Sequence, residues 1–188
     1  MRFPTVALAG LMLAAGLCAP AFAGPNTLTI ELKDGPVVIE LMPEIAPKHA
    51  ERLKELARKG DYDNVAFHRV IADFMAQTGD VRYGDMEAGF DASAVGTGGS
   101  DLPDLPAEFS NVPFERGIVG MARSQDPDSA NSQFFIMFAP GDFLNGQYTV
   151  VGKVTSGMEN VDKIKRGDDN ANGAVAEPDR MIKVTVGQ

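Results

Sequence analysis

Residues 67–80, FHRVIADFMAQTGD, place polar side chains inside an otherwise apolar run. Buried charges are costly unless they are paired, so the guanidinium of Arg69 needs either an acidic partner or a chemical role. Arginine stays protonated near neutral pH and only donates hydrogen bonds. Such a role would be electrostatic stabilisation of an electron-rich atom. His68 falls on the opposite face of an extended segment, which predicts a hydrogen-bonded structural histidine rather than a base.

Two other segments combine apolar side chains with a glutamine on one face, because strand side chains alternate between faces. The mixed faces carry Met75 and Gln77 from FMAQT, and Gln133, Phe135 and Met137 from SQFFIMF. The opposite face of the second segment carries Phe134, Ile136 and Phe138, as expected for a barrel core. Two interpretations of the mixed faces remain open. They could form an outward apolar patch with amide donors, typical of a binding site, or they could be ordinary packed residues with solvated glutamines.

The first 23 residues are predicted to be a secretory signal peptide. Arg2 precedes an apolar run from about Val6 to Leu17, and the segment ends at the small-x-small site Ala21-Phe22-Ala23. A run of roughly 12 apolar residues is too short to span a bilayer. A lipoprotein signal at Cys18 is the rival interpretation, but the preceding residue is leucine where a small residue is expected. We therefore expect an exported, periplasmic protein without a membrane anchor, with secretion outside the cell as the alternative.

Residues 24–188 are predicted to be a single domain with a sizeable core. The only cysteine lies in the signal peptide, so disulfide and thiol chemistry are excluded from the mature chain. The whole chain has a net charge of −9 from 17 basic and 26 acidic residues, and removing Arg2 makes the charge −10. This charge repels phosphate backbones and anionic lipids, which argues against nucleic acid or a membrane surface as partners.

The elements expected in this domain are mainly short strands. TLTIEL (27–32) and VVIEL (37–41) around KDGP predict a β-hairpin. A helix is expected over 43–60, where alanine and leucine recur every three or four residues before Gly60. Further strands are expected at 65–71, 74–78, 117–122, 133–138, 148–154 and 180–187, and a short helix at 157–167. The pattern predicts a mainly β fold, a barrel with helices at its ends.

Five motifs together resemble the cyclophilin family of peptidyl-prolyl cis/trans isomerases. In the family's order they are FHRVIADFMAQTGD (67–80), GTGG (96–99), GIVGMAR (117–123), SANSQFFI (129–136) and FLNGQYTVVGKV (143–154). The resemblance covers essentially all of residues 24–188 and implies a closed eight-stranded antiparallel β-barrel capped by two α-helices. It implies an isomerase that rotates X–Pro bonds in exported proteins and so assists their folding. Its partners would be proline-containing polypeptide segments, and it would act as a monomer without cofactor or metal.

The resemblance also assigns the site by position. Arg69 matches the catalytic arginine and Gln77 the amide that binds the substrate backbone. The backbone around Ala122 and Arg123 is expected to hold the peptide extended, with Gln133 beside it. The wall of the proline pocket falls on Phe74, Met75, Phe135 and Leu144.

The chain departs from the best-known eukaryotic pattern at three substrate-site positions. Phe143 stands where many members have tryptophan, Tyr148 where many have histidine, and Arg123 where many have asparagine. These residues resemble the bacterial branch and imply weak cyclosporin binding at most. The loop over 81–95 looks longer than the family minimum and is expected to border the pocket that reads residues before proline. The whole connection over 81–109 is long enough to be a functional or a disordered loop.

Three alternatives remain beside this interpretation. The first is a non-catalytic, cyclophilin-like chaperone or binding module, which the presence of Arg69 disfavours. The second is a calcium loop at DDNANGAVAEPD (168–179), but Asp179 replaces the closing glutamate and a strand follows, so a turn-rich connector is the preferred interpretation. The third is a secreted hydrolase, which is disfavoured because the chain has no G-x-S-x-G motif and no carboxylate pair beside either histidine. His68 and a solvated His49, on separate elements, also give no metal-ligand spacing.

Overall fold

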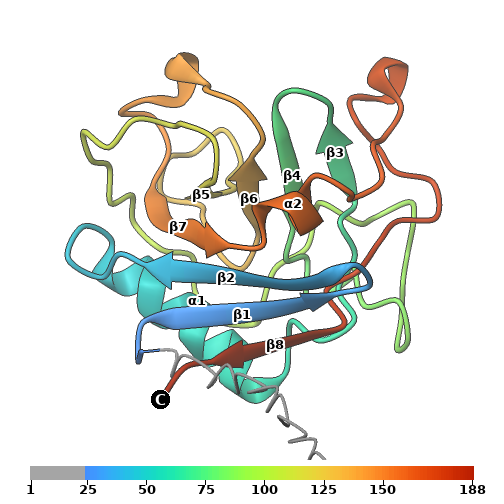
Figure 1. Cartoon of the computed structure of the whole chain (residues 1–188), viewed down its shortest axis with the longest axis horizontal. Coiled ribbons are helices and arrows are strands. Elements are labelled where there is room, and N and C mark those ends of the chain that lie inside the picture. The colour runs from blue at the N-terminus through green and yellow to red at the C-terminus, as the bar shows by residue number, and fades with distance from the viewer. Residues whose placement is uncertain (1–23) are drawn as a thin grey trace, which may run out of the picture.

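The computed structural model of the chain describes residues 24–188, and the predicted signal peptide lies outside the described residues (Figure 1). Eight strands form one antiparallel sheet in the order β3-β4-β6-β5-β7-β2-β1-β8. The strands are β1 (Thr27–Leu32), β2 (Gly35–Leu41), β3 (Arg69–Ile71), β4 (Met75–Thr78), β5 (Ile118–Met121), β6 (Phe134–Met137), β7 (Val150–Ser156) and β8 (Lys183–Val186). The mainly β fold with eight antiparallel strands is thus confirmed.

The sheet curls into a half-barrel whose two edge strands are β3 and β8. No strand ladder joins these edges within residues 24–188. Instead, the segments that lead into them meet at an isolated bridge between Ala66 and Arg180. The backbone N–H of Phe67 donates to the Asp179 carbonyl at 2.8 Å, and the N–H of Met181 donates to Val65 at 2.9 Å. The predicted strand over 65–71 is therefore shorter, because its first residues form this seam rather than a ladder.

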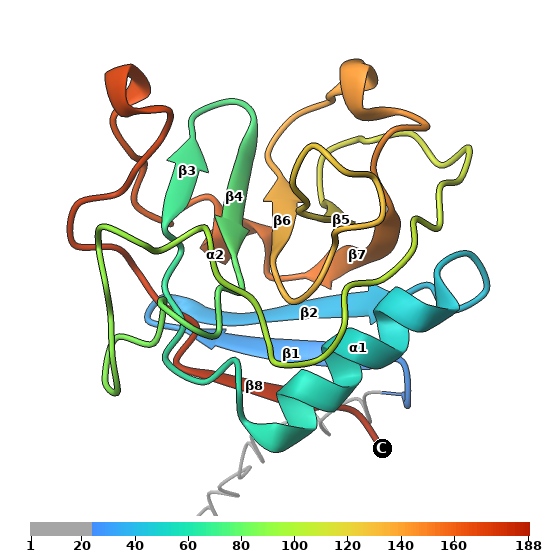
Figure 2. The same cartoon turned by 180° about the vertical axis from the view of Figure 1, so that it is seen from behind.

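Helix α1 (Pro47–Lys59) covers β1 and β8 on the side drawn toward the viewer in Figure 2. It begins four residues later than predicted, because Met42 to Ala46 form a turn and Pro47 occupies the first helical turn, where its missing N–H costs nothing. It ends at Gly60, which has a φ of +80° that favours glycine. The second helix, α2 (Met158–Val161), is a single turn rather than the longer helix expected over 157–167.

His49 on α1 is buried, so the prediction of a solvated side chain is wrong. Its Nδ1 lies 2.7 Å from Oε2 of Glu108 in the long connection. Burial lowers the pKa of His49, and the Glu108 carboxylate opposes that shift. Glu108 also accepts the backbone N–H groups of Lys48 and His49. A carboxylate from a distant segment thus caps the start of α1, where Ala46 offers no side-chain cap.

Two hydrophobic clusters lie on opposite faces of the sheet around β6. The inner cluster contains Phe134, Ile136 and Phe138, which confirms the predicted core face. The outer cluster contains Met75, Phe135 and Met137, covered by Phe114, Ile118, Leu144 and Val150. Met75 and Phe135 are only 2% and 5% exposed. The side chains of Met75 and Phe135 are therefore packed within the outer cluster.

Gly120 on β5 allows the outer cluster to close. The rings of Phe114 and Phe135 stack there with centroids 5.7 Å apart. A Cβ on Gly120 would lie 2.5 Å from Cζ of Phe135 and 2.6 Å from Cε1 of Phe114. The absence of a side chain on this strand is what lets the two aromatic rings lie flat against it.

Candidate functional site

Arg69 begins the edge strand β3 and is held by neutral groups. Its Nε donates to the Asn172 carbonyl at 3.0 Å and its Nη2 donates to the Asn172 side-chain Oδ1 at 3.1 Å. Its Nη1 donates to Oε1 of Gln77 at 3.1 Å and lies 4.0 Å from Sδ of Met75. Burial lowers the pKa of the half-buried guanidinium. Among residues 24–188 no carboxylate forms an ion pair with Arg69, so a salt bridge does not explain it.

The two predicted glutamines form a chain of amides that leads away from Arg69. Strand register places Arg69 opposite Gln77, and Gln77 opposite Phe135. Gln77 donates through Nε2 to Oε1 of Gln133 at 3.0 Å, and Gln133 donates to the Gly98 carbonyl at 2.8 Å. Neither amide is left to solvent, contrary to the solvated alternative. Each amide has a fixed orientation because each is bonded at both ends.

An aromatic surface borders Arg69 on its other side. The 3₁₀ turn η1 (Asp142–Leu144) carries Phe143, which is 66% exposed, and Leu144, which is buried in the outer cluster. The Phe143 ring lies 5.4 Å from that of Phe74, at a tilt of 43°. The exposed Phe143 and the partly buried Phe74 stand at the edge of the cluster that contains Met75 and Phe135. The result is an apolar surface with a packed floor and an open rim.

Tyr148 and Arg123 complete the same surface. The Tyr148 ring meets Phe135 edge to face with centroids 6.0 Å apart. The guanidinium of Arg123 lies 4.3 Å from the centroid of the Tyr148 ring and donates to the Gln147 carbonyl. Ala122, next in the chain, donates its backbone N–H to Gln133. The residues predicted for the site are thus connected through direct contacts around β3, β4 and β6.

The long connection lines two hollows beside these residues. A groove of about 770 Å³ runs past Gln77, Gln133 and Ala122, and Arg82 and residues 96–104 form its far wall. A separate hollow of about 300 Å³ lies next to Arg69 and Asn172 and is lined by Phe90, Ala92 and Val95. The connection is therefore part of the site surface, with Arg82 lining the groove and Phe90, Ala92 and Val95 lining the second hollow.

Asp80 fixes this connection and was missed by the sequence reasoning. The carboxylate is fully buried. Its Oδ1 accepts the backbone N–H groups of Arg82 and Tyr83 at 3.1 and 3.0 Å, and its Oδ2 accepts those of Gly96 and Gly98 at 2.7 and 2.9 Å. The two ends of a loop are thereby held on one side chain. The signal in the sequence was an acidic residue directly after an apolar strand.

His68 lies beneath the site and is buried, as expected. Among residues 24–188 neither ring nitrogen has a partner at hydrogen-bond distance and angle, contrary to the predicted hydrogen-bonded ring. The Ala66 backbone and the Gln133 side chain are the polar groups beside the ring. Burial lowers the pKa of His68, and the nearby Asp80 carboxylate opposes that shift. The imidazole is therefore held in its neutral form near pH 7.

The segment over 168–179 has the contacts of a turn-rich connector. Asp168 accepts the N–H of Asn170 at the start of the 3₁₀ turn η2 (Asp169–Ala171). Asp179, at the position of a calcium-closing glutamate, forms an ion pair with Lys33 at 2.7 Å and accepts the N–H of Lys165. Within the described part of the chain, no three acidic, histidine or cysteine side chains gather as metal ligands.

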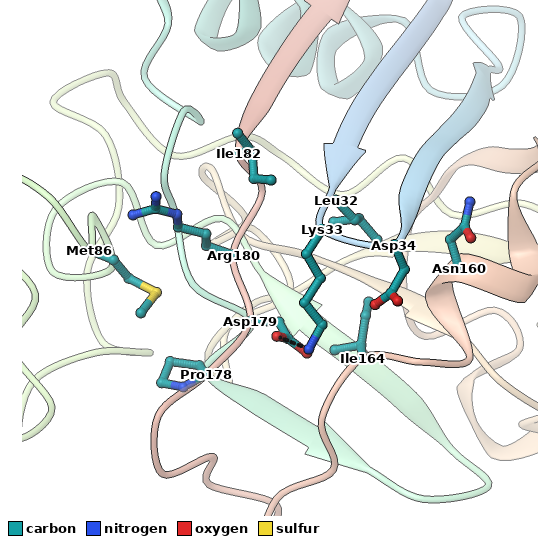
Figure 3. A pocket seen from close by; sticks show the side chains of 10 residues that line it. All are labelled: Leu32, Lys33, Asp34, Met86, Asn160, Ile164, Pro178, Asp179, Arg180 and Ile182. Atoms are coloured by element: carbon teal, nitrogen blue, oxygen red, sulfur yellow. Dashed lines mark ion pairs between the residues drawn. The ribbon is translucent and has the colours of Figure 1, made fainter.

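A further hollow of about 320 Å³ lies away from the predicted site residues, between the β1–β2 turn and the approach to β8. Figure 3 shows Leu32, Ile164 and Ile182 around it, with the Lys33–Asp179 ion pair on one wall. It contains none of the predicted site residues. Among the described helices, none is long and apolar enough to cross a membrane.

The fold and the site define an antiparallel half-barrel with an arginine, two linked amides and an aromatic surface on its outer face. Solved structures with this fold include a crystal structure of the cyclophilin AquaCyp293 from Hirschia baltica, with a TM-score of 0.71 and 26% identity over 86% of this chain and 74% of that chain. A cyclophilin-type isomerase of Cryptosporidium parvum, crystallised in the presence of the dipeptide Ala-Pro, has a TM-score of 0.73 and 25% identity over 86% of this chain and 99% of that chain.

The sequence comparisons agree with the structural ones. The family model described as cyclophilin-type peptidyl-prolyl cis-trans isomerase/CLD matches residues 27–186. A probable peptidyl-prolyl cis-trans isomerase of Brucella suis is 62% identical over 96% of this chain and 92% of its own length. The human peptidyl-prolyl cis-trans isomerase-like 1 is 32% identical over 85% of this chain and 91% of its own length. The chain belongs to the cyclophilin-type peptidyl-prolyl cis-trans isomerases, and its activity is the rotation of X–Pro bonds.

Proposed function

We propose that Arg69 is the catalytic residue of this isomerase. An X–Pro bond rotates slowly because amide resonance gives it a barrier of roughly 18–20 kcal/mol. No covalent bond is made or broken, so the reaction needs no nucleophile. In the twisted transition state the prolyl nitrogen has lost resonance and regained a lone pair. A guanidinium that donates to that lone pair stabilises the transition state more than the planar ground state. The observation that supports this role is an arginine held only by neutral acceptors.

We further propose that the aromatic surface beside Arg69 binds the proline ring. The outer cluster would be its floor, and the rings of the partly buried Phe74 and the exposed Phe143 would be its rim. Gln77 would hold the substrate backbone, because its amide is already fixed by its partners. The remaining residues of the proposed binding surface are Met75, Ala122, Arg123, Gln133, Phe135, Leu144 and Tyr148. The Cryptosporidium relative crystallised with Ala-Pro supports proline-containing segments as the substrate class.

The cellular role that we propose is folding assistance to exported proteins in the periplasm. The support is the sequence of residues 1–23, with its basic start, apolar run and small-x-small end. The substrates would be accessible X–Pro segments of exported chains, and the enzyme would act as a monomer of the bacterial exported branch. The mass of the protein recovered from a periplasmic fraction tests this. A chain that begins at Gly24 is expected, and an intact Met1 in the cytoplasm would contradict export.

The activity test compares the wild type with Arg69→Ala and Arg69→Lys on a short X–Pro peptide. A protease that cleaves only the trans form reports the isomerisation rate. Loss of one preorganised electrostatic donor lowers a rate by about 10²- to 10³-fold, and this loss in kcat/KM is expected for Arg69→Ala. Lysine keeps the charge but not the fork of donors, so partial recovery is expected. Arg116→Ala, which removes a surface pair with Asp162, is the matched control and is expected to leave the rate unchanged.

Two outcomes would reject the proposed role. A folded Arg69→Ala with wild-type kcat/KM would remove the arginine from the mechanism. An unfolded Arg69→Ala, seen by circular dichroism, would assign the guanidinium to stability. A folded wild type without any acceleration would instead favour the non-catalytic binding module.

A further inference from the structure

One edge of the Arg69 guanidinium is hydrogen-bonded to a single residue from a distant loop. Asn172 accepts from Nε through its main-chain carbonyl and from Nη2 through its side-chain Oδ1. Arginine has five N–H donors, and Gln77 takes a third at Nη1. The remaining N–H of Nη1 has only the thioether sulfur of Met75 at 4.0 Å. One N–H on each terminal nitrogen is thus left for a substrate.

Asn172 can offer both acceptors on one side because of its backbone. Its φ is +54°, in the left-handed region that asparagine adopts more readily than most residues. Gly173 follows with a φ of +80°, and a Cβ there would lie 2.5 Å from Cγ1 of Ile71 on β3. The Asn-Gly pair therefore lets the loop fold tightly against the strand that carries Arg69.

The loop around Asn172 is pinned to β3 by main-chain bonds on both sides. The N–H of Val70 donates to the Gly173 carbonyl and the N–H of Gly167 donates to the Val70 carbonyl, each at 2.8 Å. Within the loop, the N–H of Gly173 donates to the Asp168 carbonyl at 2.8 Å. These bonds fix the position of Asn172 relative to Arg69. Figure 1 and Figure 2 show this loop standing beside the β3–β4 hairpin at the same end of the barrel.

The acceptors on Asn172 are neutral, so they leave the positive charge of the Arg69 guanidinium uncompensated. A carboxylate at this place would orient the guanidinium equally well but would neutralise it. A free arginine side chain samples many rotamers, and Gln77 alone holds only one of its terminal nitrogens. An amide and a carbonyl supply orientation and leave the full positive charge for the substrate.

We propose that Asn172 is a positioning residue for catalysis, which orients Arg69 toward the prolyl nitrogen without neutralising it. This proposal rests on the proposed catalytic role of Arg69. It gives a function to residues 168–179, whose sequence starts like a calcium loop. This loop holds the catalytic side chain in place through Asn172. Preorganisation of this kind lowers the barrier because the side chain needs no ordering during the reaction.

The test uses Asn172→Gly, because glycine retains the φ of +54° and the carbonyl acceptor while removing Oδ1 alone. Loss of one orienting hydrogen bond is expected to lower kcat by about 5- to 10-fold, with KM within twofold of the wild type. Asn172→Asp is expected to lower kcat at least as far, because it keeps the geometry and neutralises the charge. Asn170→Gly is the matched control, since Asn170 bonds only Asp168, and its kcat is expected to stay at the wild-type value.

A double mutant separates positioning from a structural effect. In an Arg69→Ala background, Asn172→Gly is expected to change kcat by less than twofold, because there is no guanidinium left to orient. A loss of the same factor in both backgrounds would overturn the proposal, as would wild-type kcat in folded Asn172→Gly. Either result would reject the role of Asn172 alone. The proposed role of Arg69 is rejected by a different result, a wild-type rate in Arg69→Ala itself.

Discussion

Replacing Asp80 with asparagine tests whether one buried carboxylate organises the loop beside the site. The wild-type side chain accepts four backbone N–H groups, two on each oxygen. The amide of asparagine keeps one oxygen and replaces the other with an NH₂ group, which donates. Two N–H groups of the loop then face a donor at a buried side chain instead of an acceptor.

The expected cost follows from those two lost acceptors. Each buried donor left without a partner costs about 1–3 kcal/mol, and the charge of the carboxylate strengthens the bonds that are lost. The free energy of unfolding is therefore expected to fall by about 3–5 kcal/mol. For a domain of this size each kcal/mol lowers Tm by about 2–4 °C, so a fall of roughly 6–20 °C is expected.

Urea unfolding followed by circular dichroism measures this loss as a lower midpoint with an unchanged slope. Asp101→Asn is the control, because the Asp101 side chain is 99% exposed and pairs only with Arg82 on the surface. It is expected to change the free energy of unfolding by less than about 1 kcal/mol. An Asp80→Asn protein within 1 kcal/mol of the wild type would show that the loop does not depend on the carboxylate.

Three further predictions follow from other parts of the structure. Burial lowers the native pKa of His49 and His68 below 6.5, so the unfolded chain binds protons first. The free energy of unfolding is expected to have its full value above about pH 6.5 and to decrease as the pH falls below 6.5. In contrast, kcat/KM is expected to stay flat from about pH 6 to 9, because Arg69 remains protonated. A step in kcat/KM near pH 6.5 would contradict the mechanism. Gly120→Ala is expected to displace the stacked Phe114 and Phe135 and to raise KM for X–Pro peptides by more than threefold. An unchanged KM would show that the outer cluster does not contribute to substrate binding. Phe143→Trp is expected to tighten cyclosporin binding at least tenfold by calorimetry, about 1.4 kcal/mol. An unchanged affinity would contradict the expectation that Phe143 weakens cyclosporin binding.

Strand periodicity predicted most of the sheet, and the family resemblance assigned the candidate site residues by position. Alternation put Gln133 and Phe135 on one face of their strand and Phe134 on the other. The structure adds the pairing between strands, which places Gln77 opposite both Arg69 and Phe135. The positions of these side chains depend on backbone geometry that repeats every two residues. Such regular positions can be read from a sequence without knowledge of tertiary contacts.

The loops could not be predicted in the same way. Asn172 and Asp80 act through single bonds to residues far along the chain, and no local pattern specifies those partners. His49 is an intermediate case. Its spacing of four residues before Leu53 was a signal for the buried face of α1 that the prediction of a solvated side chain overlooked. Its partner, Glu108, comes from the long connection, which no local pattern indicates. The short α2 was overestimated because Gly157 and the following turns end the periodic pattern.

The pairing of β1 with β8 has a consequence for how the chain folds. β1 lies near the start of the described chain, and β8 contains some of its last residues, yet they are hydrogen-bonded neighbours. Until β8 arrives, the β1–β2 hairpin presents an unpaired edge that another chain could extend. Pairings of such high sequence separation are slow to form. β8 therefore controls when the sheet is complete, and a chain in which β8 has not yet been made or has been removed would stay open to aggregation along β1.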